Sequence, residues 1–193
     1  MKLYKIYSRA IGLLFALSFL CVGCENEDIL DINDLEISPS NPESVVIVEP
    51  DDGITSVNAL TKAINENGDA TYILRRDGVY YMEGKNVFKH NVVIKAENGS
   101  GKMPIIQPIC DAQGALNADM IRLEGSATFE NIYIIGKDAA TGNLMQRLFR
   151  IDESNVRLKF DNCFIDHCRN FCIRTDNVNN KIYLNNSAIR NLA

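Results

Sequence analysis

A short motif recurs three times in the second half of the chain and restricts its fold more than any other feature. The three copies are FENIYI at Phe129–Ile134, FDNCFI at Phe160–Ile165 and LNNSAI at Leu184–Ile189. Their central asparagines lie 31 and then 24 residues apart. A period of about 20 to 50 residues indicates a solenoid, whose stacked coils repeat every ~4.8 Å. The spacing predicts that Asn131, Asn162 and Asn186 form one column and share amide hydrogen bonds at a turn.

The residues around the repeat alternate as in β-strands. After each asparagine, the first and third residues are predicted to point inward, namely Ile132 and Ile134, Cys163 and Ile165, and Ser187 and Ile189. Earlier in the chain, Asp77-Gly78 and a Gly-rich turn separate short strands at Thr71–Leu74, Val79–Met82, Val92–Lys95 and Pro104–Ile106. The pattern predicts an all-β solenoid.

One helix is predicted, over Ile54–Gly68. Apolar residues line one face, Thr55 or Ser56 can cap its N-terminus, and Gly68 ends it.

The helix, the strand–Asp-Gly–strand series and the asparagine repeat together resemble the pectin-lyase-like, chondroitinase-B-like right-handed parallel β-helices. The resemblance covers about Gly53–Ala193 and implies a β-helix whose N-terminal end is covered by the helix. It is strongest to surface lipoproteins of glycan-degrading Gram-negative bacteria, which implies an acidic polysaccharide as partner. The fold hosts lyases, hydrolases, epimerases and non-catalytic binders, and no catalytic motif of the family is present.

The N-terminus is predicted to be an export signal. Three basic residues precede the apolar run Ala10–Leu20, whose 11 residues fall short of the ~20 that cross a bilayer. The following Cys21-Val22-Gly23-Cys24 resembles a bacterial lipobox, so residues 1–23 are predicted to be a lipoprotein signal peptide and Cys24 to carry the lipid. Ordinary cleavage, with Cys24 left as a free thiol, is the alternative.

Residues 24–52 are predicted to be a disordered acidic linker, because they hold ten acidic and no basic residues. The acidic stretch resembles a surface-export signal, and a merely solvated tether is the alternative. With either role for the acidic stretch, the lipid anchor is expected to hold the protein at the outer membrane. A surface-export signal would make it face the exterior. The remaining residues 53–193 carry a net charge of +2, which argues against nucleic-acid binding.

A second match gives the candidate site. Arg122, Arg150 and Arg174 each follow an apolar residue and lie two positions before an acid, in IRLE, FRID and IRTD. On stacked strands they form an outward row suited to uronate carboxylates or sulfates. The acids Glu124, Asp152 and Asp176 form a second row, which can bind Ca²⁺. The alternative is a surface lattice of salt bridges between the two rows.

Three functions follow from this site. The preferred one is a non-catalytic protein that binds or helps process an acidic polysaccharide. The second is a polysaccharide lyase acting by β-elimination, with Arg150, Arg174 and Lys159 as the candidate bases or neutralising cations. The third is a structural or adhesive surface protein. No metal site is expected from Cys110, Cys163, Cys168 and Cys172, which leave room for one disulfide.

Residues 70–193 give four or five turns, and only Arg190–Ala193 follow the last repeat. We therefore expect the C-terminal end of the β-helix to be incomplete, as in a truncated product. The open strand edge could otherwise be covered by a second copy or by another chain.

Overall fold

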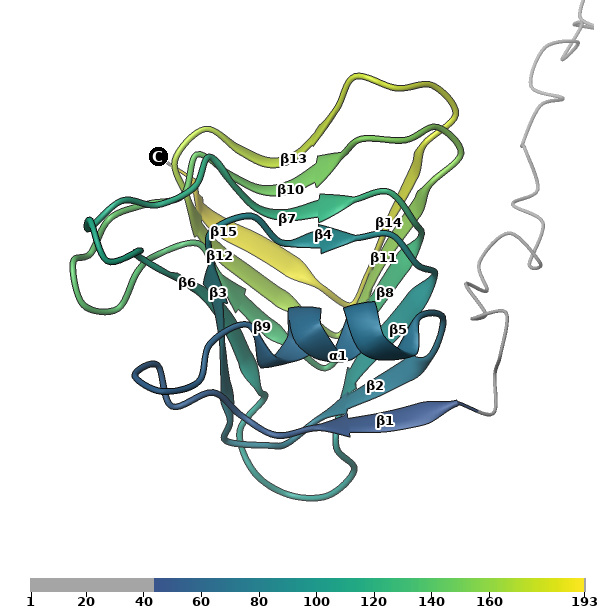
Figure 1. The fold of residues 1–193 in the computed structure, drawn as a ribbon. Coiled ribbons are helices and arrows are strands. Elements are labelled where there is room, and N and C mark those ends of the chain that lie inside the picture. The colour runs from purple at the N-terminus through teal and green to yellow at the C-terminus, as the bar shows by residue number, and fades with distance from the viewer. Residues whose placement is uncertain (1–43, 193) are drawn as a thin grey trace, which may run out of the picture. The chain divides into compact units, whose positions relative to one another are not determined.

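The computed structural model describes residues 44–192, which form a parallel β-solenoid of three sheets (Figure 1). In spatial order, sheet 1 contains β1 (Val45–Val48), β2 (Thr71–Leu74), β5 (Val92–Ala96), β8 (Ala127–Glu130), β11 (Arg157–Asp161) and β14 (Lys181–Asn185). Sheet 2 contains β3 (Val79–Glu83), β6 (Ile105–Ile109), β9 (Tyr133–Ile135), β12 (Phe164–Cys168) and β15 (Ala188–Leu192). Sheet 3 contains β4 (Val87–Phe88), β7 (Asp119–Leu123), β10 (Arg147–Ile151) and β13 (Phe171–Thr175).

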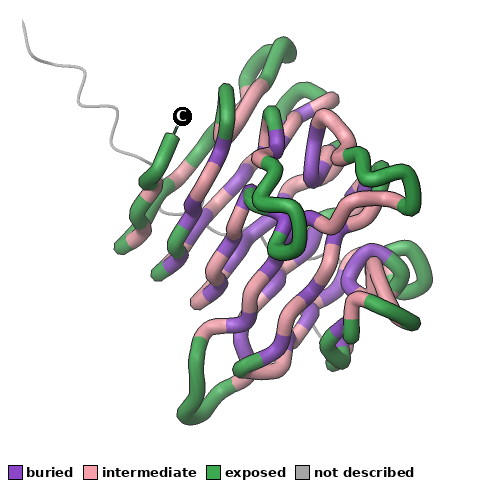
Figure 2. Tube along the Cα trace, turned by 90° about the vertical axis from the view of Figure 1, so that its left-hand side faces the viewer, coloured by how far each residue is buried: buried purple, intermediate pink, exposed green. Residues whose placement is uncertain are grey.

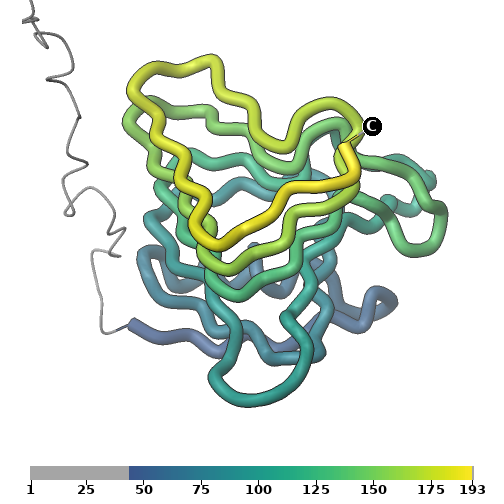
Figure 3. Tube along the Cα trace, turned by 180° about the vertical axis from the view of Figure 1, so that it is seen from behind, coloured from purple at the N-terminus to yellow at the C-terminus, as the bar shows by residue number. Residues whose placement is uncertain are grey.

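The chain visits the three sheets in turn and then starts the next coil, so that successive coils stack (Figure 3). Every pairing between these strands is parallel. The expected parallel β-solenoid is confirmed. Sheet 1 has five strands after residue 70, within the predicted range, and β1 adds a sixth.

The asparagine column is present at the bend between sheets 1 and 2. Asn131, Asn162 and Asn186 all have left-handed backbone conformations, with φ of 58°, 50° and 47°. Asparagine tolerates this conformation better than most residues, which explains its recurrence at the bend. The Asn162 side-chain amide donates to Oδ1 of Asn131 at 2.6 Å, so the predicted amide contact between coils is confirmed for this pair.

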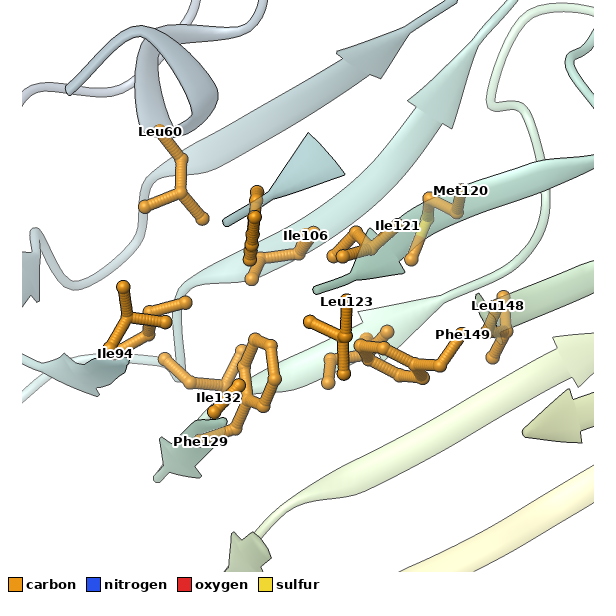
Figure 4. Close-up of a cluster of buried hydrophobic side chains, with 14 of the residues drawn as sticks. Leu60, Ile94, Ile106, Met120, Ile121, Leu123, Phe129, Ile132, Leu148 and Phe149 are labelled. Carbon is orange, nitrogen blue, oxygen red and sulfur yellow. The ribbon is translucent and has the colours of Figure 1, made fainter. Parts of the chain in front are cut away.

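The core fills the space between the sheets. Phe129 and Phe160, on neighbouring strands of sheet 1, stack with their ring centroids 5.5 Å apart. Phe149 of sheet 3 packs edge-on against both rings. Aromatic contacts of this kind add about 0.5–1.5 kcal/mol to the free energy gained by burial. Figure 4 shows Phe129, Phe149 and their aliphatic neighbours pointing into this space. Of the inward rows predicted from the repeat, Ile132, Ile134, Cys163 and Ile165 are buried in this core, whereas Ser187 and Ile189 of the last coil are only partly buried.

Helix α1 (Ala59–Asn67) lies across the N-terminal end of the solenoid, as expected (Figure 1). Its Leu60 and Ile64 are fully buried, and it packs against β1, β3 and β4. Gly68 ends it, with φ of 70°. Among residues 44–192, no helix has the length and hydropathy that a membrane span needs.

The predicted N-cap of this helix is wrong. The residue at the cap is Asn58, which has a left-handed backbone and makes no side-chain cap hydrogen bond. Thr55 and Ser56 belong instead to a turn before the helix, where the Thr55 hydroxyl and the Ser56 N–H donate to the carboxylate of Asp52. This acidic side chain organises the loop and delays the helix.

The solenoid also begins earlier than the sequence predicts. Strand β1 lies inside the range predicted to be linker, yet it pairs in register with β2, Val46 beside Tyr72 and Val48 beside Leu74. The burial of Val48 supplies the reason, because this apolar side chain joins the core. The signal peptide, Cys24 and the part of the predicted linker up to residue 43 lie outside the described residues.

The residues of the last turn are mostly exposed or half-buried (Figure 2). Leu158 and Phe160 of β11 are fully buried, whereas their partners in β14, Ile182 and Leu184, are 41% and 49% exposed. Association through this edge stays a prediction.

Replacing Asn162 tests the column. We expect Asn162→Ala to lower the free energy of unfolding by about 1–3 kcal/mol, because alanine disfavours the left-handed bend and lacks the amide. Asn162→Gly keeps the bend and removes only the amide, so it should lose about 1 kcal/mol. Urea unfolding measures both. Equal stability of wild type and Asn162→Ala would show that the column does not hold the coils.

Candidate functional site

The three arginines predicted to bind substrate lie side by side on sheet 3. Arg150 on β10 is in register with Arg122 on β7 and with Arg174 on β13. Their side chains are 28%, 30% and 41% exposed for Arg122, Arg150 and Arg174. The predicted outward row is therefore confirmed, while its role in binding stays a prediction.

Carboxylates neutralise this row. Arg150 pairs with Asp152 at 2.6 Å, and Arg174 pairs with Asp176 at 3.0 Å. Arg122 reaches across to the same Asp152 at 3.4 Å. The hydrogen bond and charge of Asp152 raise the pKa of Arg150 above its ordinary value. The geometry is that of the salt-bridge lattice that the sequence left as the alternative to a row of free cations.

A buried carboxylate anchors the same sheet. The Asp119 side chain is fully buried at the start of β7 and pairs with Arg147, the first residue of β10. It also pairs with Arg122 at 2.9 Å. Sequence reasoning missed this pair. Asp119 and Arg147 are the first residues of β7 and β10, the strands that carry Arg122 and Arg150. The pair links two coils and orients Arg122.

A hollow of about 610 Å³ lies beside the amino ends of the strands of sheet 3. Two long connections from sheet 2 to sheet 3, residues 110–118 and 136–146, form its walls, and the short turn before β13 adds Arg169. The lining residues are Gly114, Ala115, Leu116, Asn117, Ala118, Gly142, Asn143, Leu144, Gln146 and Arg169. Ala118 and Gln146 precede the row arginines of their own strands by four residues, or about 13 Å of extended chain. The hollow and the arginine row therefore share one side of the solenoid.

Asp138 ties the two walls together. Its carboxylate accepts hydrogen bonds from the N–H and hydroxyl of Thr141 in one wall and from the N–H of Cys110 in the other. Burial raises the pKa of this nearly inaccessible carboxyl, but these hydrogen bonds outweigh burial and leave the pKa below its ordinary value. The tie is therefore present above the unfolded-state pKa and is lost as the pH falls through the lowered one.

Arg169 differs from the row arginines. Its backbone N–H donates to the carbonyl of Met145 at 2.9 Å. Its guanidinium makes no hydrogen bond or ion pair with any residue of the part of the chain that is described. Sequence reasoning did not single it out, because it belongs to no repeat. The available signal was the longer asparagine spacing, the 31 residues from Asn131 to Asn162. Its extra residues form the wall at 136–146 beside Arg169.

The candidate bases for β-elimination do not meet. Arg150 and Arg174 lie on sheet 3, whereas Lys159 lies on β11 of sheet 1. Lys159 therefore does not share a face with the two arginines, and the role of each residue as a base or neutralising cation stays a prediction. The physical reason is that the turn after Ile151 carries the chain onto a different face of the solenoid.

The calcium hypothesis placed the ion between Glu124, Asp152 and Asp176. Two of these carboxylates are held by arginines, and Glu124, which follows β7, is exposed. Within residues 44–192, no three acidic, histidine or cysteine side chains gather in a group that could hold a metal ion.

Comparison with known proteins supports the fold. Among solved structures, the chain is similar to a mutant of the PL6 family alginate lyase AlyGC, with a TM-score of 0.55 and 19% sequence identity. The match covers 76% of this chain and 20% of that one, so this chain spans about a fifth of the length of the lyase. No protein-family model and no curated protein matches the chain. The likeness extends to the β-solenoid alone.

Removing the buried carboxylate tests how sheet 3 is held. We expect Asp119→Ala to lower the free energy of unfolding by about 3–5 kcal/mol, because Arg147 would keep a largely buried charge without its partner. Glu124→Ala, in the same strand region but exposed, should change it by less than about 0.5 kcal/mol. Thermal or urea unfolding measures the difference, and equal effects would argue against a structural pair.

Proposed function

We propose that this protein is a lipid-anchored outer-membrane protein that binds an acidic polysaccharide on its sheet 3 side without cleaving it. The observation that carries the proposal is Arg169, an arginine without a partner among the described residues that lines the hollow. A cation beside a solvent-open hollow suits an anionic ligand, and arginine suits the planar carboxylate of a uronate because it can donate two parallel hydrogen bonds.

The other polar residues of the hollow suit a sugar. Asn117, Asn143 and Gln146 bring carboxamides, which both donate and accept and so match the hydroxyls of a pyranose. In this proposal, a uronate lies against Arg169 and the carboxamides bind its ring hydroxyls. The polysaccharide then continues along sheet 3 past Arg122, Arg150 and Arg174. These arginines already share their charge with Asp119, Asp152 and Asp176, so each adds less to binding.

Alanine variants test this order of contributions. With uronate oligosaccharides from alginate as the probe, Arg169→Ala should weaken binding roughly 10- to 100-fold, the loss of a charge-assisted hydrogen-bonded pair. The double variant Arg150→Ala with Arg174→Ala should weaken it less. Lys62→Ala, on the exposed face of α1, is the control and should bind as the wild type does.

Isothermal titration calorimetry gives the affinities, with a neutral gluco-oligosaccharide as the control ligand. Equal binding by the wild type and Arg169→Ala would reject the hollow as the site. If the protein binds neither oligosaccharide, a structural or adhesive role is favoured.

Lyase activity is the second candidate, and the structural likeness to an alginate lyase favours it. β-Elimination would produce an unsaturated uronate with its own ultraviolet absorbance, which a continuous assay with alginate detects. We expect no increase in absorbance, because Arg150 and Arg174 are paired with carboxylates and Lys159 lies on a different sheet. If absorbance increases with the wild type but not with purified Arg150→Ala, lyase activity would replace the binding proposal.

Export through Cys24 can be tested separately. The wild type is expected to fractionate with outer membranes and to be cleaved by protease added to intact cells, since the lipid holds it at the surface. Cys24→Ser removes the acceptor thiol and should release the protein from the membrane fraction, while Cys110→Ser should not. Membrane association of Cys24→Ser would contradict the lipid anchor.

A further inference from the structure

Two cysteines flank the turn that carries Arg169. Cys168 is the last residue of β12 in sheet 2, and Cys172 is the second residue of β13 in sheet 3. Cys168 is fully buried, and Cys172 is half-buried and packs against the core. The corner between the two sheets therefore brings both side chains to the same side of the chain.

The Cys168 thiol lies beside Cys172. It donates to the carbonyl of Phe171 at 2.8 Å, and this carbonyl belongs to the peptide bond that joins Phe171 to Cys172. Interaction between the two thiols also shifts the pKa values of both. A disulfide requires its two Cα atoms to lie within about 7 Å and its Cβ atoms to face one another. A thiol that already contacts the peptide bond before Cys172 needs only small side-chain movements to reach the second sulfur.

The electrostatics of the pair favour reaction. The neighbouring Cys172 thiol lowers the pKa of Cys168, and burial opposes this effect only in part. The first proton of the pair therefore leaves more readily than the proton of an isolated thiol. The thiolate is the nucleophile in thiol–disulfide exchange, so the pair is better suited to oxidation than an ordinary buried cysteine.

The remaining described cysteines lack such a partner. Cys163 is buried on the inner side of the asparagine bend, where its thiol donates to the carbonyl of Phe129, and burial raises its pKa to about 11. Cys110 lies in a wall of the hollow, with its sulfur 3.6 Å from the hydroxyl of Thr141. Neither shares a thiol contact, so each serves as a control.

We propose that Cys168 and Cys172 form a disulfide that closes the turn carrying Arg169. In an oxidising compartment this bond clamps β12 to β13 at the hollow and holds the Arg169 backbone in place. In a reducing environment the structure with two free thiols is the stable form. The proposal depends on the thiol geometry alone and not on any bound polysaccharide.

A small disulfide such as oxidised glutathione supplies the oxidising equivalents. After the pair loses one proton, the cysteine thiolate attacks one sulfur of the reagent, which forms a mixed disulfide and releases one glutathione thiolate. The other cysteine then loses its proton, attacks the cysteine sulfur of the mixed disulfide and releases the second glutathione thiolate. Two electrons pass from the cysteines to glutathione, and the two protons that the cysteines lose are taken up by the released thiolates.

Tryptic mapping tests the bond directly, because trypsin cuts after Arg169 between the two cysteines. The full-length protein is equilibrated in glutathione buffers of increasing oxidation, blocked with iodoacetamide and digested. We expect the peptides Phe160–Arg169 and Asn170–Arg174 to be joined in oxidised samples and to separate on reduction. Phe160–Arg169 also contains Cys163, so the Cys163→Ser variant must still give the joined peptides.

Matched variants complete the test. Cys168→Ser and Cys172→Ser should each abolish the joined peptides, whereas Cys110→Ser should leave them unchanged. Amide hydrogen exchange at residues 169–173 should slow on oxidation of the wild type and not of Cys172→Ser. The proposal is overturned if both cysteines are alkylated at every ratio of oxidised to reduced glutathione. It is also overturned if Cys172 is joined to Cys110 or Cys163.

Discussion

The parallel stacking of one coil on the next, maintained at the asparagine bend, is the constraint on which the rest of this structure depends. Each coil must turn sharply from sheet 1 to sheet 2 directly above the same turn in the coil before it. Asn131, Asn162 and Asn186 take the left-handed conformation that makes this turn. Because the bend fixes the register, the phenylalanines of the core stack, and the arginines of sheet 3 fall into one row.

The corner between sheets 2 and 3 is free to vary, and the candidate site lies there. Two successive coils cross it through long connections at residues 110–118 and 136–146, and the next coil crosses it through the short turn at Arg169. The long connections stand beside the short one and leave the hollow. Gly136 lets the wall start close to the next coil, because a Cβ there would lie 2.1 Å from the carbonyl oxygen of His167. The repeat thus fixes the scaffold, and the departures from it shape the site.

This division explains what could be predicted from the sequence. The asparagine column, the inward rows and the arginine row follow from a local period, which is visible without knowledge of long-range contacts. The predicted helix cap is wrong because Asp52 organises the loop before α1. No sequence motif shows that Thr55 and Ser56 donate to this carboxylate instead of capping the helix. The start of the solenoid at β1 was missed because four apolar residues within an acidic stretch look like linker. Arg169 was missed because only the fold shows that its guanidinium has no partner among the described residues.

The central claim is that the ligand lies against the unpaired arginine rather than along the neutralised row. The most direct measurement is an NMR titration of arginine Nε–Hε resonances with a uronate oligosaccharide. The account predicts that the resonance of Arg169 shifts and saturates, together with the carboxamide resonances of Asn117 and Asn143, while those of Arg150 and Arg174 move little. Saturating shifts at Arg150 and Arg174 with an unchanged Arg169 resonance would contradict it.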